Sequence, residues 1–406
     1  MKFIFWISLA GILYTYLGYP IWMWMLARLR PRPWAVKQIV PSVSVVLAVH
    51  NGAALLSRKI EHLLGLDYPN IKEIIIVSDG STDGTAEILG LQRHPRLTSV
   101  IQPEHCGKAA ALNVGMAKAT ADVILFVDIR PEIAPGAIQR LVNNFADSKV
   151  GCVAGELILR WNYHDATCAA VSGVYWRYEK WIRSSESRSG SPVGVYGGFY
   201  AIRREIAVPL PEGLILDDMF QPLSIIRQGY RSVLDPLADV YDTWPTIIDH
   251  EFKRKVRTLA GNFQLFHLAP WMLSPGNPVL FRLFSHKVMR LAVPYLMLML
   301  LVSSLALSGG SIAFTIFAAL QLFFWLIAIA ALRFRFSVVH RAASAASALL
   351  VLNVAAVSGL YKYIFSRGPL WKIWGANMPS AISSSAMVEI SSLTDHFSSA
   401  VGNDRV

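Results

Sequence analysis

A long apolar stretch at the start of the chain sets the first limit on its fold. From Phe3 to Leu26 no side chain carries a charge. At about 1.5 Å per residue, a helix of this length crosses a hydrocarbon core of roughly 30 Å. A cleaved signal peptide would have a shorter apolar region followed by a small-residue cleavage site. Arg28, Arg30, Arg32 and Lys37 follow instead, and such a basic flank marks the cytoplasmic side of a transmembrane helix.

Three further apolar stretches lie near the C-terminus. They are Leu291 to Leu307, Ile312 to Leu332 and the Ala- and Ser-rich segment Ala342 to Leu360. If all three cross the membrane, the basic residues after the last one fall on the outer side, against the usual distribution of charge. These residues are Lys362, Arg367 and Lys372. The sequence therefore leaves open whether one of the three stretches is re-entrant.

The composition agrees with a membrane protein that has a sizeable water-soluble part. Of the 406 residues, 54% are hydrophobic and 16% are charged, which excludes a disordered chain. The formal net charge is +11. Because the basic side chains gather at membrane flanks and in loops, we expect no nucleic-acid partner. The three cysteines have neither zinc-site spacing nor the pattern of a disulfide framework.

Changes in composition divide the chain into five parts. A soluble domain follows the first apolar stretch, and an aromatic and basic segment suited to a membrane interface precedes the other three. The Ser-rich end of the chain predicts disorder. The expected parts are 1–40 for the N-terminal helix and linker, 41–262 for the soluble domain, 263–290 for the interfacial segment, 291–374 for the C-terminal transmembrane bundle and 375–406 for the tail.

The soluble domain alternates strand-like and helix-like segments. Val43 to Val49 is almost entirely apolar and β-branched, and short apolar runs recur at Ile74–Val77, Leu97–Ile101 and Val123–Val127. This alternation predicts a Rossmann-like, doubly wound α/β domain with a parallel sheet. Such sheets bind ligands at the carboxyl ends of their strands. The polar residues expected at those ends include Asn51, Asp79 and Asp128.

Several motifs in a fixed order carry a family resemblance. They are Val77-Ser-Asp-Gly-Ser-Thr-Asp-Gly-Thr85, Gly107-Lys-Ala-Ala-Ala-Leu-Asn113, Leu125-Phe-Val-Asp128, Leu216-Asp-Asp-Met219 and Lys253-Arg-Lys-Val-Arg-Thr258. In these motifs the chain resembles the membrane-bound family 2 glycosyltransferases of the GT-A fold, the branch that includes hyaluronan, chitin and cellulose synthases. The resemblance covers roughly residues 41 to 264.

The resemblance implies a binding site for a UDP-sugar at the strand ends. Asp79 would recognise the uracil, and Asn51 at the same edge counts among the substrate-binding residues. A plain turn in which Asp83 caps the next helix is the structural alternative for this motif. Lys108 opens a helix, so its ammonium group and the unpaired amides of the first turn suit a diphosphate.

The metal motif departs from the family pattern. Asp128 ends an apolar strand, from which a carboxylate can hold Mg²⁺ or Mn²⁺ against diphosphate oxygens. Arg130 stands where the family has a second acid. Either Asp128 binds the metal with water and phosphate, or Arg130 supplies part of the positive charge as a phosphate partner. A divalent cation is the expected cofactor, with Asp128 as its protein ligand.

Two adjacent acids are candidates for the general base. Glycosyl transfer needs a group that takes the proton of the acceptor hydroxyl and positive charge that stabilises the departing diphosphate. By resemblance Asp218 is the base and Asp217 its neighbour, although one of them could instead cap a helix. Arg254 and Arg257 lie three residues apart on one helical face, which suits either the diphosphate or lipid.

The element around Arg257 also departs from the family. Against the family's Gln-x-x-Arg-Trp element, Arg257 matches the arginine, Arg254 replaces the glutamine and Thr258 replaces the tryptophan. The missing tryptophan removes a surface on which sugars stack. Processive synthesis and the transfer of one or a few sugars are therefore equally open.

Together these features predict an inverting glycosyltransferase of the inner (plasma) membrane with a cytoplasmic catalytic domain. It would move a sugar from a UDP-sugar to a saccharide or lipid-linked acceptor, in contact with membrane lipids and with other polysaccharide-synthesis proteins as candidate partners. A polyprenyl-phosphate glycosyltransferase is the enzymatic alternative. A non-catalytic membrane scaffold that retains the fold is the alternative of another class.

Overall fold

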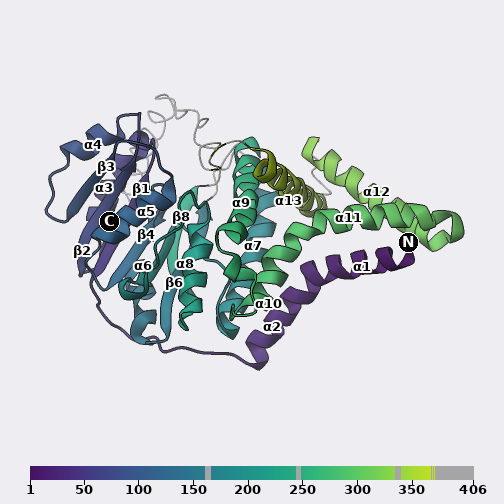
Figure 1. Ribbon diagram of the computed structural model, residues 1–406, viewed down its shortest axis with the longest axis horizontal. Coiled ribbons are helices and arrows are strands. Elements are labelled where there is room, and N and C mark those ends of the chain that lie inside the picture. The colour runs from purple at the N-terminus through teal and green to yellow at the C-terminus, as the bar shows by residue number, and fades with distance from the viewer. Residues whose placement is uncertain (161–165, 244–247, 334–339, 367, 369, 371–406) are drawn as a thin grey trace, which may run out of the picture.

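The computed structural model describes residues 1–160, 166–243, 248–333, 340–366, 368 and 370. Figure 1 shows a lobe built of a sheet and helices, from which long helices project to one side. The tail predicted for 375–406 lies outside the described residues, as do Arg367 and Lys372.

A sheet that has eight strands within the described residues forms the centre of the lobe. The strands are β1 (Val43–Val49), β2 (Ile71–Asp79), β3 (Leu97–Gln102), β4 (Val123–Val127), β5 (Glu132–Ile133), β6 (Val150–Arg160), β7 (Phe199–Arg203) and β8 (Arg231–Thr243). Their order is β3-β2-β1-β4-β7-β6-β8-β5. The first four are parallel, as predicted, but β7 is antiparallel to both β4 and β6. The sheet is therefore mixed: β6 and β8 are parallel to each other and run in the direction of the first four strands, whereas β7 and β5 run antiparallel to their neighbours.

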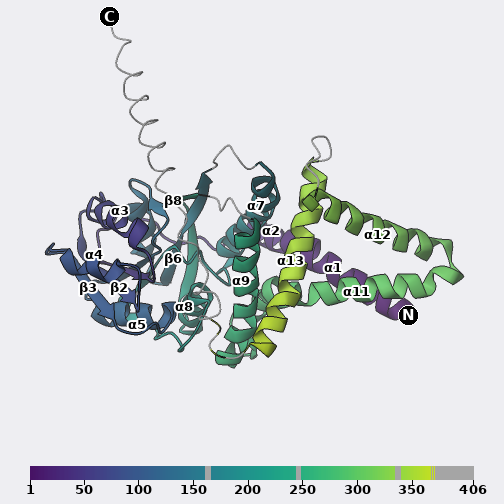
Figure 2. The same ribbon diagram turned by 90° about the horizontal axis from the view of Figure 1, so that it is seen from above.

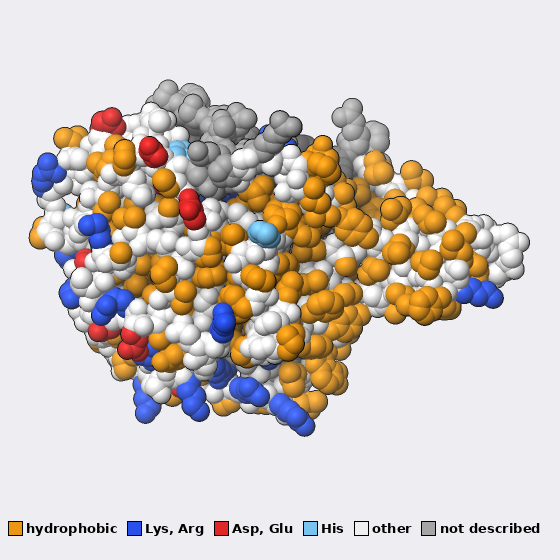
Figure 3. All heavy atoms as spheres, in the orientation of Figure 1, with side chains coloured by type: hydrophobic (Ala, Val, Ile, Leu, Met, Phe, Trp, Pro, Cys, Tyr) orange, Lys and Arg blue, Asp and Glu red, His pale blue; other side chains and the backbone are white. Residues whose placement is uncertain are grey.

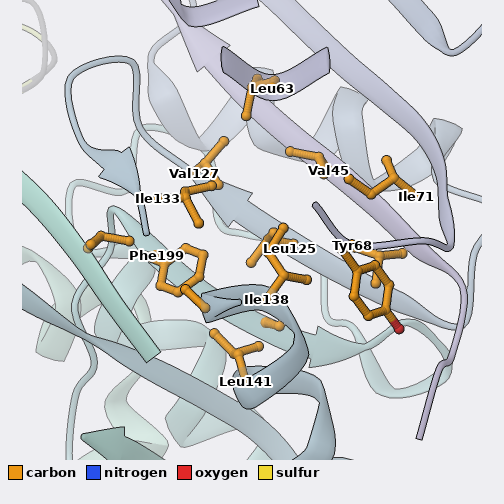
Figure 4. Packing of buried hydrophobic residues seen from close by; sticks show 14 of the residues in the cluster. Val45, Leu63, Tyr68, Ile71, Leu125, Val127, Ile133, Ile138, Leu141 and Phe199 are labelled. Carbon is orange, nitrogen blue, oxygen red and sulfur yellow. The ribbon is translucent and has the colours of Figure 1, made fainter. Parts of the chain in front are cut away.

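Helices cover both faces of the sheet. They are α3 (Ala53–Leu64), α4 (Thr85–Leu91), α5 (Lys108–Lys118), α6 (Ala137–Asn143), α7 (Ala166–Ser189), α8 (Asp217–Arg227) and α9 (Ile248–Leu268). Along β1, Val45 packs in the cluster that includes α3 and α6, and Val46 packs in the cluster that includes α5 and α8. Figure 4 shows the first cluster, with Leu63, Leu125 and Ile138 among its members. Burial on both faces explains why these strands are continuous apolar runs.

Four stretches of helix are long and apolar enough to cross a membrane, counted over the described residues alone: Lys2–Leu29, Leu280–Gly310, Ile312–Ala330 and Ala346–Phe365. Their main elements are α1 (Lys2–Leu13), α2 (Tyr19–Leu29), α10 (Leu280–Leu283), α11 (Met289–Leu307), α12 (Ile312–Arg333) and α13 (His340–Phe365). π-Helical turns at Tyr14–Gly18 and Phe284–Val288 join α1 to α2 and α10 to α11. The expected interfacial segment 263–290 is divided, because its start completes α9 and its end opens the second long helix.

α13 does not follow the direction of the other long helices. Figure 2 shows it crossing the line of α1, α11 and α12 and lying alongside α9. The contact with α9 is close, since a Cβ atom on Gly359 would lie 2.9 Å from the backbone nitrogen of Ala260. Val354, Val357 and Tyr361 are exposed at helical spacing. α13 thus packs on the soluble lobe with one face and presents an apolar stripe on another.

Gly155 offers a test of packing inside β6. A Cβ atom at this position would lie 2.5 Å from the carbonyl oxygen of Ala238 and 2.3 Å from a ring carbon of Phe199. Because both neighbours are buried, we expect Gly155→Ala to lower the free energy of unfolding by about 1–3 kcal/mol through overpacking. The melting temperature of the purified protein should fall by several degrees. Gly90→Ala is the control, since nothing lies within 4 Å of a Cβ there; equal melting temperatures for the two variants would contradict the prediction.

Candidate active site

The carboxyl ends of β1, β2 and β4 lie side by side at one edge of the sheet. β1 is in parallel register with both neighbours, so that Leu47 is opposite Val127 and Val49 is opposite Ser78. Asp128 follows β4 directly, and its backbone N–H donates to the carbonyl oxygen of the Gly198 residue at 3.3 Å. The loop before β7 is therefore held against the end of β4. Polar groups from both halves of the sheet meet here.

Lys108 joins two of the predicted acids. Its Nζ lies 3.1 Å from Oδ1 of Asp128 and 3.3 Å from Oδ1 of Asp217. α5 begins at Lys108, after Gly107 has turned the chain with a φ of +94°. Desolvation lowers the pKa of Lys108, but the carboxylates of Asp128, Asp217 and Asp218 outweigh it and leave the pKa raised. The lysine is a fixed cation between acids from distant parts of the chain.

Asp217 and Asp218 open α8 beside this lysine. Asp217 is buried, and the hydroxyl of Tyr200 donates to its Oδ2 at 3.5 Å. Asp218 packs on the loop before β7, where a Cβ atom on Gly197 would lie 3.0 Å from the Cβ of Asp218. The cap position of α8 belongs to Leu216, which makes no side-chain bond, so neither acid is the cap residue. Desolvation, followed by the charge of Asp217, raises the pKa of Asp218 to about 7, a value suited to proton transfer near neutral pH.

α9 brings two arginines to the same edge. The charge of Arg257 acts on all three acids described above, and the charge of Arg254 acts on the hydroxyl group of Tyr196. Both arginines are exposed. Thr258, which stands where the family has tryptophan, donates its hydroxyl to the carbonyl oxygen of Arg254 at 3.1 Å. The helix thus adds positive charge to the acidic group without adding an aromatic surface at residue 258.

Arg130 is paired with an acid that the sequence analysis did not single out. Its Nη2 lies 3.3 Å from Oδ2 of Asp242, a buried side chain near the end of β8. The charges of Asp242 and Asp128 both act on Tyr196, so Asp242 belongs to the same cluster. β8 reaches this edge by pairing with β6 and β5. In the sequence, Asp242 is marked only as an acid near the end of an apolar segment. That pattern does not reveal which strands pair with β8.

Comparison with known proteins decides the family. The family model described as glycosyl transferase family group 2 matches residues 126–338, more than half of the chain, and the model described as glycosyl transferase family 2 matches residues 44–207. The chain belongs to the family 2 glycosyltransferases. The resemblance seen in the sequence motifs is thereby confirmed.

Two relatives of this glycosyltransferase have N-acetylglucosamine in their names. The poly-beta-1,6-N-acetyl-D-glucosamine synthase of Staphylococcus aureus is 26% identical over 228 residues, which cover 55% of this chain and 55% of the relative. An N-acetylglucosaminyltransferase of Rhizobium meliloti is 24% identical over 265 residues, which cover 62% of this chain and 61% of the relative. The chain therefore matches only about half to three fifths of the length of these curated relatives.

A solved structure shares the fold of the glycosyltransferase. It is the mannosyltransferase PcManGT from Pyrobaculum calidifontis, described in complex with GDP-Man and Mn²⁺. The similarity has a TM-score of 0.69 at 21% sequence identity and covers 90% of this chain and 100% of that chain. The predicted combination of a GT-A lobe with long apolar helices is thereby confirmed at the level of the fold.

Asp79 of the glycosyltransferase is enclosed by protein donors. Its Oδ1 accepts the N–H of Cys106 at 2.8 Å, and its Oδ2 accepts the N–H of Gly107 at 2.8 Å and lies 2.7 Å from Nδ1 of His105. The side chain is buried. Both oxygens thus hold the turn that leads to Lys108. The contact of Asp79 with uracil stays a prediction.

Asn51 also bonds within the protein. Its backbone has a φ of +50°, and its Oδ1 accepts the N–H of Thr82 at 2.8 Å, which ties the loop after β1 to the loop after β2. Oδ1 of Asp83 accepts the N–H of Thr85, the first residue of α4, at 3.2 Å, although the cap position of that helix belongs to Gly84. The rings of His50 and His105 stack beside these loops with centroids 3.7 Å apart. No motif in the sequence indicates a role for this pair.

Asp128 can serve as one ligand of the expected divalent metal if the substrate's phosphates supply others. Its carboxylate side chain is 41% exposed beside Lys108. Within the part of the chain that the structure describes, no group of three or more His, Cys, Asp or Glu side chains could hold a metal ion. Mg²⁺ is commonly held by one or two carboxylates, with waters and substrate phosphates completing its shell. The donor set therefore suits a metal that binds together with a diphosphate.

Proposed function

We propose that this glycosyltransferase moves a sugar from a UDP-sugar to an acceptor hydroxyl with inversion at the anomeric carbon. The observation that carries the proposal is the group Asp128, Lys108 and Asp217, joined by ion pairs, with Asp218 beside it. Asp218 takes the hydroxyl proton while the acceptor oxygen bonds to the anomeric carbon and the bond to the diphosphate oxygen breaks. Lys108 and Arg257 stabilise the negative charge that develops on the departing UDP.

Asp128 would hold Mg²⁺ or Mn²⁺ at this site. When bound, the metal supplies positive charge to the diphosphate oxygens. Arg130 is fixed by Asp242 and offers a planar pair of donors to a phosphate in the place where the family has a second acid. Arg254 extends the positive charge along α9.

We place N-acetylglucosamine first among the donor sugars, because it appears in the names of both curated relatives. The acceptor is a saccharide or a lipid-linked saccharide that arrives from the membrane, since α13 packs directly on α9. This assigns the enzyme to the synthesis of an exopolysaccharide or another cell-surface glycan. Transfer to a polyprenyl phosphate is the second candidate, favoured by Thr258 in place of a sugar-stacking tryptophan.

Sugar incorporation by membranes that contain the full chain tests this function. The membranes receive radiolabelled UDP-N-acetylglucosamine or another nucleotide sugar from a panel, with an oligosaccharide or a polyprenyl phosphate as acceptor. We expect incorporation with Mg²⁺ or Mn²⁺, its loss with a chelator and its return when metal is restored. Product found only on polyprenyl phosphate would select the second candidate. Binding of UDP without incorporation in any combination would overturn the proposal in favour of a scaffold.

The pKa of Asp218 predicts how activity depends on pH. A general base must be unprotonated, so kcat/KM should rise with pH and level off above the pKa, which burial and Asp217 raise to about 7. Since the charge of Asp217 raises this pKa, Asp217→Asn should move the acid limb to lower pH. The measurement is the pH profile of kcat/KM for both forms. An acid limb near pH 4, as for an ordinary carboxyl group, that does not move in the variant would contradict the prediction.

We further propose that Lys2–Leu29, Leu280–Gly310 and Ile312–Ala330 cross the plasma membrane and that α13 lies along its cytoplasmic face. The crossed direction of α13 (Figure 2) and its exposed apolar stripe support this topology. Lys362 then stays on the same side as Arg28, Arg30 and Arg32, which removes the conflict with the charge rule. The catalytic lobe is cytoplasmic in this arrangement.

Cysteine labelling in intact cells checks the topology. A membrane-impermeant maleimide should modify Ser308→Cys, in the turn between α11 and α12, and should not modify Lys362→Cys. The native Cys106 is exposed on the catalytic lobe and should react only after the cells are permeabilised, which makes it the internal control. Labelling of Lys362→Cys in intact cells would show that α13 crosses the membrane.

A further inference from the structure

A cavity lined by arginines lies where two candidate membrane spans meet the catalytic lobe. Its volume is about 420 Å³. The first span ends at Leu29 and the second begins at Leu280, and the cavity draws residues from both sides of this border. It is lined by Leu26, Arg30, Pro31, Arg32, Ser189, Pro278 and Arg282.

One of the three lining arginines is fixed by the end of α7. Nη1 of Arg282 donates to the carbonyl oxygens of Glu186 at 2.6 Å and Ser191 at 2.8 Å. Nη2 donates to the carbonyl oxygen of Ser189 at 3.0 Å and to its Oγ at 3.1 Å. These carbonyl groups include those left unpaired at a helix C-terminus, where a cation is favourable. The position of the Arg282 charge is therefore set before any ligand binds.

The other two lining arginines have no such partners. Arg30 and Arg32 are exposed, and within the described residues neither side chain meets a hydrogen-bond acceptor or a carboxylate. Arg32 also lies close enough to repel the guanidinium groups of Arg231 and Arg282. Three like charges around one cavity, with no acid in its lining, favour an anion inside it.

The carboxylate whose charge acts on Arg282 belongs to Glu186, and it bonds to other groups. Oε1 of Glu186 lies 2.8 Å from Nδ1 of His286 and accepts the hydroxyl of Tyr19 at 2.5 Å. Its side chain is fully buried, facing those partners. Glu186 therefore reduces the positive charge of the cavity only in part.

The place of the cavity identifies the anion. Leu26, Pro31 and Pro278 give it an apolar wall at the border of the spans, and Figure 3 shows basic side chains along the lower edge of the molecule, next to the hydrophobic surface of the projecting helices. A phosphate attached to an acyl chain matches both surfaces at once. We propose that this cavity binds the phosphate of an anionic phospholipid headgroup.

A bound headgroup would also fix the linker that joins the first span to β1. The backbone N–H of Arg32 donates to the carbonyl oxygen of Arg188 at 2.8 Å, and Nη1 of Arg231 donates to that of Pro33 at 3.3 Å. A phosphate between Arg30, Arg32 and Arg282 neutralises the repulsion across these contacts. Occupancy of the site should therefore raise the melting temperature of the protein.

Retention of lipid by the purified full chain tests the proposal. The probe is phosphatidylglycerol titrated into phosphatidylcholine nanodiscs, and native mass spectrometry counts the lipid retained. We expect Arg30→Gln with Arg32→Gln to weaken retention roughly 30-fold, from about 1 kcal/mol for each basic side chain near an anionic lipid. Arg28→Gln with Lys37→Gln is the matched control, because it removes the same charge from the same flank without touching the cavity lining. Arg32→Gln alone gives a smaller loss and serves if the double variant does not fold.

Two results would overturn the assignment. Equal losses of phosphatidylglycerol in the cavity variant and in the control would mean that the basic flank attracts lipid only as diffuse charge. A separate arm adds inorganic phosphate to phosphatidylcholine nanodiscs and measures the melting temperature. If inorganic phosphate stabilises the wild type as much as phosphatidylglycerol does, and the cavity variant abolishes this effect, the ligand is a soluble phosphate and not a lipid headgroup.

Discussion

Replacing Asp218 by asparagine is expected to lower kcat for sugar transfer by about 10²–10⁴-fold. The amide has nearly the shape of the carboxylate but cannot take the proton of the acceptor hydroxyl. Asp218 packs against Gly197 and adjoins the pair formed by Lys108 and Asp217, so a substitution of equal size keeps the surrounding contacts. The KM for the donor should change little, because the diphosphate is held by cations and not by this carboxylate. Initial rates of radiolabelled sugar transfer measure both quantities.

Glu212→Gln is the matched control for this prediction. Glu212 is an exposed acid in the loop that leads to Asp218, and its replacement removes one negative charge without reaching the ion-paired group. It should leave kcat within about twofold of wild type, as is usual for surface substitutions. If Asp218→Asn retained comparable activity with an unchanged melting temperature, Asp218 would not be the base.

The first half of the sheet could be predicted because its strands are buried on both faces. Val45 and Val46 pack in different clusters on opposite sides of β1, which requires an unbroken apolar run. The same logic places Asp128 at the end of such a run, and the parallel register of β1 with β4 brings it to the ligand-binding edge.

The second half of the site depended on contacts that no local pattern records. β7 enters the sheet antiparallel to β4, and β8 carries Asp242 to Arg130 by pairing with strands far away in the sequence. The surroundings of Asp79 were hidden for a similar reason. Whether its oxygens face a nucleotide or the turn at His105 depends on hydrogen bonds that form only when the loop has folded.

The course of α13 could not be predicted either, because hydropathy depends on the length and composition of a helix and not on its direction. The residues of α13 pass the same criterion as the other candidate spans. Its course across them follows from the close contact of Gly359 with Ala260 on α9. Only the basic residues at its C-terminal end and beyond, such as Lys362, indicated a conflict in the sequence.

Lys108→Gln is expected to lower kcat/KM by about 10²–10³-fold, the range for removing one preorganised group that stabilises charge in the transition state. Without the ammonium group, Asp128 and Asp217 face each other and the incoming diphosphate with no cation between them. The KM for the nucleotide sugar should therefore rise as well as kcat fall. Lys118→Gln, at the exposed far end of the same helix, is the control and should leave both constants near wild type.

A double variant separates the two roles that this lysine could have. Lys108→Gln should lower the melting temperature, because it leaves the buried carboxylate of Asp217 without its ion-pair partner. Adding Asp217→Asn removes that charge, so the double variant should regain part of the lost stability. Its activity should not recover, since the cation for the diphosphate is still missing. Recovery of activity together with stability would assign Lys108 a structural role only.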